Sequence, residues 1–185
     1  MPPPVTLPRT LIAGTPENIN DVQDNFTAIQ TEFNASWPQC RVTNTAAQSI
    51  PNNTGTAITF DTEQIDQGTA SSNMHDIVTN TSRIVCRVAG LYTISATLPF
   101  VVNGTGLRLA YIRLNGTTST PGTQVIQPPN AGFLTTIALS TIYRLAISDY
   151  IELMGFQSSG GALNTSIDTG TGDGRPMLSA AMLSP

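Results

Sequence analysis

Lysine is absent from this sequence of 185 residues, and charge of either sign is scarce. Eight arginines carry all the basic charge, charged residues make up 11% of the chain, and the net charge is -4. A protein that binds nucleic acid through its phosphates needs a basic patch, so we expect no nucleic-acid partner. The one histidine, His75, lies beside Asp76 in the polar segment SSNMHD, where we expect a solvated or turn-forming residue. Without a second histidine, a lysine or a Gly-x-Ser-x-Gly elbow, we predict no enzymatic activity and no cofactor.

Cysteine is nearly absent too, because only Cys40 and Cys86 are present. Two cysteines are too few for a disulfide framework, and no spacing in the chain suits zinc. Free cysteines are among the most buried residues, so buried free thiols on strands are the favoured interpretation. A single disulfide between neighbouring strands is the alternative, in a protein that functions outside a reducing cytosol.

Acidic residues form two groups whose spacing does not define a metal site. The glycine-rich segment 168–175, DTGTGDGR, lacks both the Gly-Lys-Ser/Thr of a phosphate loop and the terminal Glu of an EF-hand. We therefore expect a flexible surface loop there, with calcium bound through Asp168 and Asp173 as a minor alternative. The second group is loose, and spacing alone does not assign it an ion; it consists of Asp61, Glu63, Asp66 and Asp76.

The first residues, MPPPVTLPRTL, contain four prolines and no long apolar run. They match neither a secretory signal nor a membrane anchor, and no membrane insertion is expected. Proline favours polyproline-like extension, so residues 1–14 are predicted to be an extended arm that anchors the chain on another surface. A disordered tail is the alternative.

Residues 19–33, INDVQDNFTAIQTEF, carry the one strong helical pattern of the chain. The apolar positions are spaced three, four, three and four residues apart, as in a heptad seam; they are Ile19, Val22, Phe26, Ile29 and Phe33. Thr15 can cap the helix and Pro16 suits its first position, while Trp37-Pro38 disfavours its continuation. A short helix is marginal alone, so this seam needs a partner. Packing on its own domain is one possibility, and a parallel bundle is the favoured one, which makes residues 15–36 a trimerising stem.

Short alternating runs follow, separated by Gly, Pro, Asn and Asp. The clearest run has apolar residues at every second position and small hydroxyl residues between them; its apolar members are Tyr92, Ile94, Ala96, Leu98 and Phe100. About 8 to 10 such strands without intervening helices predict an all-β, antiparallel sandwich or jelly roll over residues 37–185.

One strand, LRLAYIRL at residues 107–114, is apolar on both faces. A sandwich buries one face of each sheet, so the second face needs another cover, and a second subunit would supply it. Segment 133–156 shows the same feature less cleanly. We therefore predict a head trimer interface containing Leu107, Leu109, Tyr111 and Tyr143.

Four landmarks occur in order: TFDTE at 59–63, AGLY at 89–92, Asn115-Gly116, and LAISDYIEL at 145–153. They resemble the globular heads of the complement and tumour necrosis factor superfamily, including bacterial and bacteriophage versions, and segment 177–183 is similar to that family's last core strand. The landmark residues are Phe60, Gly90, Tyr92, Asn115, Gly116 and Asp149. Ser148 stands where the family usually has glycine.

The resemblance implies a ten-stranded jelly roll that assembles as a homotrimer on a stem. The segment AGTPENINDVQDNF also resembles the opening of many phage tail and head-fibre proteins. Together these predict a non-enzymatic protein of the virion surface, made in the host cytoplasm. It is either a capsid decoration protein or head fibre, or a tail-fibre or tail-tip head for host attachment. Its arm would contact phage capsid or tail proteins, and loops 66–82, 117–131 and 157–175 could bind a host glycan or protein. A soluble bacterial lectin-like or adhesive module is the alternative.

Overall fold

The computed structural model describes residues 19–34, 37–68, 72–119, 123–167 and 174–185. Within these ranges lie one helix and thirteen strands, four of which are only two residues long. The elements are α1 (Ile19–Asn34), β1 (Gln39–Thr43), β2 (Ser49–Ile50), β3 (Thr56–Ala57), β4 (Thr62–Gln67), β5 (Arg83–Val85), β6 (Gly90–Phe100), β7 (Arg108–Leu114), β8 (Thr118–Ser119), β9 (Val125–Gln127), β10 (Thr135–Leu145), β11 (Tyr150–Gln157), β12 (Leu163–Asn164) and β13 (Met177–Ser184). The proline-rich arm lies outside the described residues.

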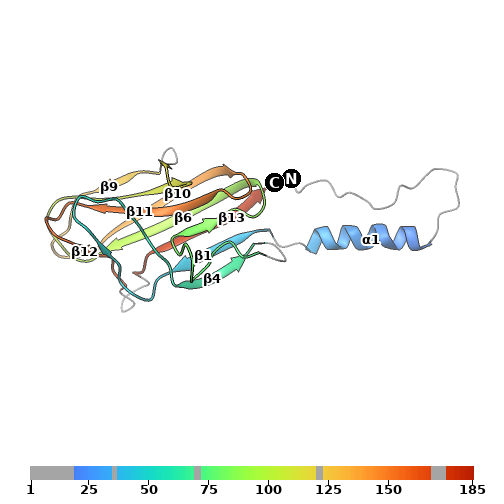
Figure 1. Ribbon diagram of the computed structural model, residues 1–185, viewed down its shortest axis with the longest axis horizontal. Helices are drawn as coiled ribbons and strands as arrows, with labels where there is room; N and C mark the ends of the chain where they lie inside the picture. Colours follow the sequence, from blue (N-terminus) through green and yellow to red (C-terminus); the bar gives the residue numbers. More distant parts are fainter. Residues whose placement is uncertain (1–18, 35–36, 69–71, 120–122, 168–173) are drawn as a thin grey trace.

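Eleven of the strands form two antiparallel sheets that pack face to face as a sandwich (Figure 1), and β2 and β12 pair separately with each other. The five-stranded sheet has the order β10-β6-β13-β1-β4. In the six-stranded sheet, β11 pairs with β7. The short strands β3 and β5 also pair with β11, and the short strands β8 and β9 also pair with β7. Strands distant in sequence are neighbours in both sheets, as in a jelly roll. The predicted fold class is confirmed.

The core lies between the sheets and is built from alternate residues of each long strand. In β6, Tyr92, Ile94 and Leu98 are fully buried, while the hydroxyl residues between them face outward. A strand turns successive side chains to opposite faces, so the alternation read from the sequence translates directly into a buried side and an outer side. The landmark Phe60 is also buried in this core.

The helix α1 extends away from the sandwich (Figure 1), and the C-terminal strand β13 ends at the same end of the head. α1 covers the predicted heptad segment 19–33, whereas the predicted cap Thr15 and first position Pro16 lie outside the described residues. Phe26 is 62% exposed and Ile29 is 41% exposed. Two seam residues are therefore exposed in the single chain, and the partner of the helix stays a prediction. Among the described residues, no helix is long and apolar enough to cross a membrane.

Candidate functional site

On the outer side of the five-stranded sheet, β10, β6 and β13 present uncharged and mostly small side chains. Three cross-strand rows compose this surface, and we call it the small-residue face: Ala138, Thr97 and Met177; Ser140, Ser95 and Ser179; Ile142, Thr93 and Ala181. In the central row, the hydroxyls of Ser95 and Ser179 are 2.7 Å apart and share a hydrogen bond. None of the nine residues is charged.

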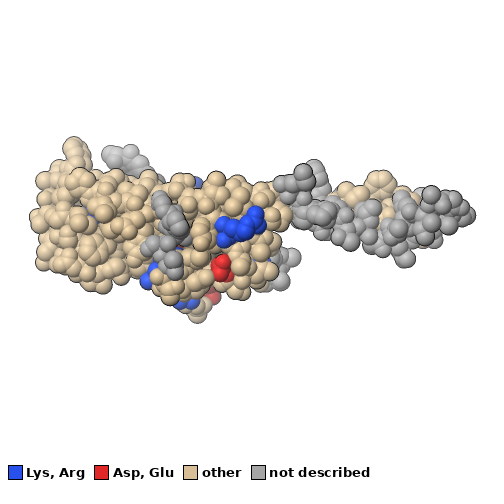
Figure 2. Space-filling view, turned by 90° about the horizontal axis from the view of Figure 1, so that it is seen from above, with Lys and Arg blue, Asp and Glu red and all other residues tan. Residues whose placement is uncertain are grey.

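Small side chains make this face suited to close contact. Threonine, serine and alanine lose little side-chain entropy when they are covered, and their short side chains let another backbone approach. Ile142 is 60% exposed although it is apolar. Arg144 lies opposite Leu91 at the end of β10, and Arg41 on β1 lies opposite Ser179, beside the central row of the face. Figure 2 shows how few charged side chains appear on the face of the head that it displays.

The outer side of the six-stranded sheet carries an apolar row with a shallow groove beside it. Phe156, Leu109 and Ile126 lie opposite one another on β11, β7 and β9. The groove has a volume of about 340 Å³ and is lined by Gly55, Leu109, Tyr111, Gln124 and Phe156. This apolar surface explains why the sequence of β7 is apolar on both faces.

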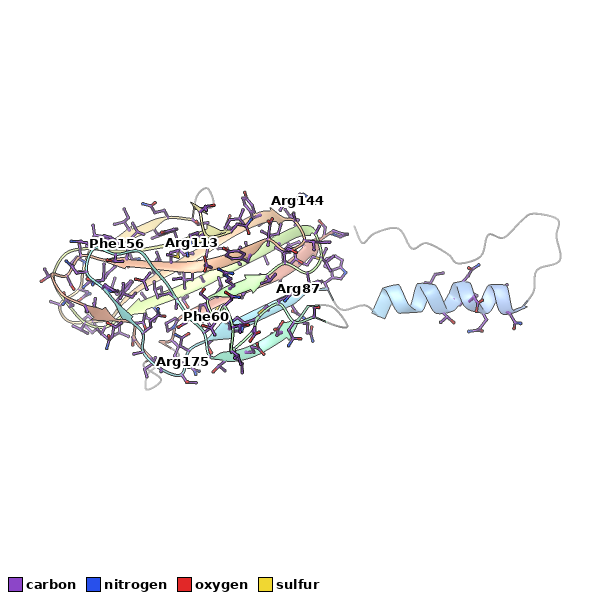
Figure 3. The ribbon with its side chains drawn as sticks, viewed as in Figure 1. Phe60, Arg87, Arg113, Arg144, Phe156 and Arg175 are labelled. Carbon is purple, nitrogen blue, oxygen red and sulfur yellow. The ribbon has the colours of Figure 1, made fainter. Side chains whose placement is uncertain are left out.

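Next to the groove, Glu152 is buried between two arginines. Its Oε2 accepts hydrogen bonds from Arg113 Nε at 2.9 Å and Nη2 at 2.8 Å, and its Oε1 accepts one from the Ser82 hydroxyl at 2.8 Å. Arg83 approaches Oε1 to 3.7 Å and lies 4.1 Å above the ring of Tyr150. Figure 3 shows Arg113 and Phe156 coming from the adjoining strands of this sheet. The cluster ties β5, β7 and β11 together and has no free nucleophile.

The predicted interface residues do not share one surface. Leu109 and Tyr111 are half-buried on the outer side of β7, and Leu107 directly precedes that strand. Tyr143 on β10 lies opposite Tyr92 on β6 and packs against the hydrophobic core. Tyr143 is thus brought to the inner layer rather than to the apolar face of the other three. Their contacts in an assembly stay a prediction.

The stem residues are placed only in part. Val22, Phe26 and Ile29 lie on α1 as the heptad spacing requires, and Val22 is half-buried. Ile19 and Phe33 also belong to the helix. The partner of this seam stays a prediction.

Two landmark glycines occupy positions that a side chain could not share. A Cβ on Gly90 would collide with the carbonyl oxygen of Ser184, so β13 can approach β6 only at a glycine. Gly116 has φ +72°, and a Cβ there would lie 2.7 Å from the hydroxyl of Tyr150. Tyr92 donates its buried hydroxyl to the Val88 carbonyl at 2.7 Å. These landmarks serve the fold.

The expectation that His75 is solvated is wrong. The residue is only 3% exposed and its ring lies edge-on to Phe60, with 6.5 Å between ring centroids. Burial depends on partners brought in by folding, Glu63 and the Thr81 carbonyl, which the local sequence SSNMHD does not reveal.

The acidic residues near His75 are engaged in turns. Asp61 accepts hydrogen bonds from the backbone and hydroxyl of Thr45, and Asp76 accepts them from Val78 and Thr79. In the described part of the chain, no group of three or more His, Cys, Asp or Glu side chains could hold a metal ion. Asp168 and Asp173 lie outside the described residues, as do parts of the three predicted apical loops.

Cys40 and Cys86 are both free and buried, as the favoured interpretation predicted. Cys40 is on β1 and Cys86 directly follows β5. Burial raises the pKa of each thiol. The alternative of a disulfide between them is excluded.

Sequence reasoning missed Arg108, which is completely buried. Its guanidinium donates to the carbonyls of Thr105, Leu107 and Asn103 and so holds the turn before β7. The sequence signal for a buried arginine was its position within an apolar strand.

Three solved structures illustrate the similarity of this fold to known proteins. Murine APRIL at pH 8.0 matches with a TM-score of 0.57 and 11% identity, over 79% of this chain and 98% of that one. Eiger TNF from S. frugiperda matches with a TM-score of 0.55 and 10% identity, over 80% and 93%. The globular domain of zebrafish complement 1qA protein matches with a TM-score of 0.51 and 10% identity, over 79% and 97%.

Sequence comparison adds no relative to these structures. No protein-family model and no curated protein matches the chain. Identities near 10% show the fold alone. The chain has the jelly-roll fold of tumour necrosis factor-like and complement 1q-like globular domains.

Proposed function

We propose that the chain is a non-enzymatic structural protein that assembles as a homotrimer and is displayed on the surface of a bacteriophage virion. The observation that carries the proposal is the small-residue face, three cross-strand rows of β10, β6 and β13 without a charged side chain. Isolated sheets usually expose a polar, partly charged outer side, whereas a surface that is covered in an assembly loses charge at its centre.

The stem and the head support the same assembly. The resemblance to complement and tumour necrosis factor heads implies a trimer, and the exposed Phe26 and Ile29 leave a helical seam that other copies could cover. A short helix that is unstable alone becomes stable when a larger head interface holds three copies together.

Ser95→Arg tests the head interface, because Ser95 lies in the central row of the small-residue face. Burying an unpaired charge opposes association, so we expect a folded monomer. Analytical ultracentrifugation would give the mass and circular dichroism the β content. Val78→Arg is the matched control, because Val78 is 81% exposed in a loop, and it should remain trimeric. A Ser95→Arg trimer of normal stability would contradict this interface.

The double change Val22→Asp and Ile29→Asp tests the stem. Two charges in the seam should weaken the assembly of the helix while the head retains its β signal. Mass and thermal stability equal to those of the unchanged protein would count against a bundled stem.

Gold-labelled antibodies against residues 37–185, applied to particles of the source phage, test the virion role. Label over the shell would identify a capsid decoration protein or head fibre, with the arm contacting the capsid. Label at the tail would identify an attachment head whose loops contact a host glycan or protein. Particles without label would refute the virion role and favour the free adhesive module.

A further inference from the structure

Segment 72–82 connects the two sheets, and the buried ring of His75 fastens it at two points. Nδ1 of His75 lies 3.1 Å from Oε1 of Glu63 on β4, and Nε2 lies 3.1 Å from the carbonyl oxygen of Thr81. The His75 side chain is completely buried, whereas Glu63 is partly exposed. The ring thus joins the beginning and the end of the segment to the edge of the five-stranded sheet.

Both neighbours of the ring are acceptors. A carbonyl oxygen only accepts hydrogen bonds, and an ionised carboxylate does the same. Two hydrogen bonds therefore require an N–H on each ring nitrogen, and only the imidazolium has both. A neutral ring keeps one N–H and turns a lone pair toward the other oxygen.

We propose that His75 is a proton-dependent latch: its protonated ring holds segment 72–82 against β4, and loss of the proton releases one of the two attachments. The segment lies within loop 66–82, so the latch would govern how firmly this loop is presented at the surface. The proposal rests on the single-chain geometry and is independent of the virion role.

The other titratable groups around the ring do not share this behaviour. Asp66 on β4 accepts the backbone N–H groups of Met74 at 2.8 Å and His75 at 3.0 Å, which gives the segment an attachment that survives loss of the ring proton. Asp76 follows His75 and caps the turn at Val78 and Thr79. Burial, with Asp66 and Glu63 adding to it, raises the pKa of the Cys40 thiol on β1, which stays neutral. The pair that changes on loss of the ring proton is therefore the ring and Glu63.

The protonation state can be read directly, because His75 is the only histidine in the chain. The full-length protein labelled with 15N-histidine should show one imidazole, with both nitrogens protonated while the segment is closed and one proton lost as the pH is raised. Hydrogen exchange at the amides of Phe60 and Val85, which donate to the carbonyls of Thr81 and Met74 in this segment, should show protection falling by on the order of tenfold over the same titration, after correction for intrinsic rates. A neutral ring throughout, or protection that does not change while the ring titrates, would overturn the proposal.

Glu63→Gln provides the decisive variant. The glutamine amide can donate to a neutral Nδ1 while Nε2 still donates to Thr81, so the segment should stay closed at pH 8 and the pH dependence of protection should disappear. Asp76→Asn is the control in the same segment, because Asp76 hydrogen-bonds to Val78 and Thr79 and acts on the ring only through its charge. It should retain the pH dependence, with the midpoint moved to lower pH. An unchanged pH dependence in Glu63→Gln would refute the coupling.

Discussion

Asn115 and Asp149 are hydrogen-bonded through their side chains, with Nδ2 of Asn115 2.8 Å from Oδ1 of Asp149. The Oδ1 of Asn115 also accepts the Tyr150 N–H at 2.9 Å, and the Oδ2 of Asp149 accepts the Ala146 N–H at 2.8 Å. The turn after β7 is thereby locked to the turn before β11. Two of the landmarks that carried the sequence resemblance are thus explained by local geometry.

Asn115→Asp should destabilise the head by about 2 kcal/mol, because it removes the amide donor and places two carboxylates together. Asn115 has φ +50°, which aspartate also tolerates, so backbone strain adds little to the effect. Urea denaturation at pH 7 measures the loss. At pH 3.5, where a protonated carboxyl can donate, the difference from the unchanged protein should shrink. Equal urea midpoints at pH 7 would show that the lock contributes nothing.

Ser148→Gly should stabilise the head. Ser148 has φ +72°, in the left-handed region where a side chain costs about 1–2 kcal/mol. Glycine removes that strain, but it also raises the conformational entropy of the unfolded chain, which offsets part of the benefit. The net gain in the free energy of unfolding should be roughly 0.5–1 kcal/mol. Differential scanning calorimetry would show a higher Tm. Ser148→Ala, which keeps the strain, should leave the Tm unchanged, and a gain there equal to that of glycine would contradict the argument.

Glu152→Gln should cost about 2 kcal/mol, because Arg113 loses its buried counter-charge. The cost stays below that of a fully buried pair, since both arginines reach solvent. Arg83→Gln should cost less, because Arg83 lies 3.7 Å from the carboxylate and is the more exposed partner. Chemical denaturation of the two variants would give the order of the losses. A larger loss for Arg83→Gln would mean that its stacking on Tyr150 dominates the cluster.

Local sequence patterns predicted individual helices and strands well, but they did not predict which distant segments pair. The alternation from Tyr92 to Phe100 identified β6, and the heptad spacing identified α1, because each pattern is contained in one element. The burial of His75 depends on Glu63 and Thr81, which only folding brings together. Apolar alternation predicts Tyr143 at an interface, whereas the residue packs against the core. Alternation distinguishes the two faces of a strand but does not show which face meets the core.

Both thiols should resist modification in the native head. Only a thiolate reacts readily, and burial raises the pKa of Cys40 and Cys86. The disulfide-forming reagent DTNB at pH 8 should therefore label neither residue in native protein and both residues after denaturation in guanidinium. Fast labelling of one thiol in the native protein would show that its part of the sandwich opens readily.

Acid should weaken the turn that joins Thr45 to Asp61. Burial alone would raise the pKa of Asp61, but hydrogen bonds from the side chains of Thr45 and Thr62 and from backbone N–H groups outweigh it and lower the pKa. A carboxyl whose pKa is lowered by folding contributes stability above its unfolded pKa, and this stability is lost as the pH falls through the folded value. The protein should therefore lose this contribution below about pH 4.

Thr45→Val tests this contribution, because it removes the hydroxyl that lies 2.7 Å from Oδ2 of Asp61 and leaves the backbone N–H donor in place. The variant should have a lower Tm than the unchanged protein at pH 7, and the two should converge as acid protonates Asp61 in both. Thr54→Val is the matched control, because its hydroxyl donates to the Asn52 carbonyl, which does not titrate. Its Tm difference should stay constant from pH 7 to pH 2. A constant difference for Thr45→Val as well would show that the lowered pKa of Asp61 has another source.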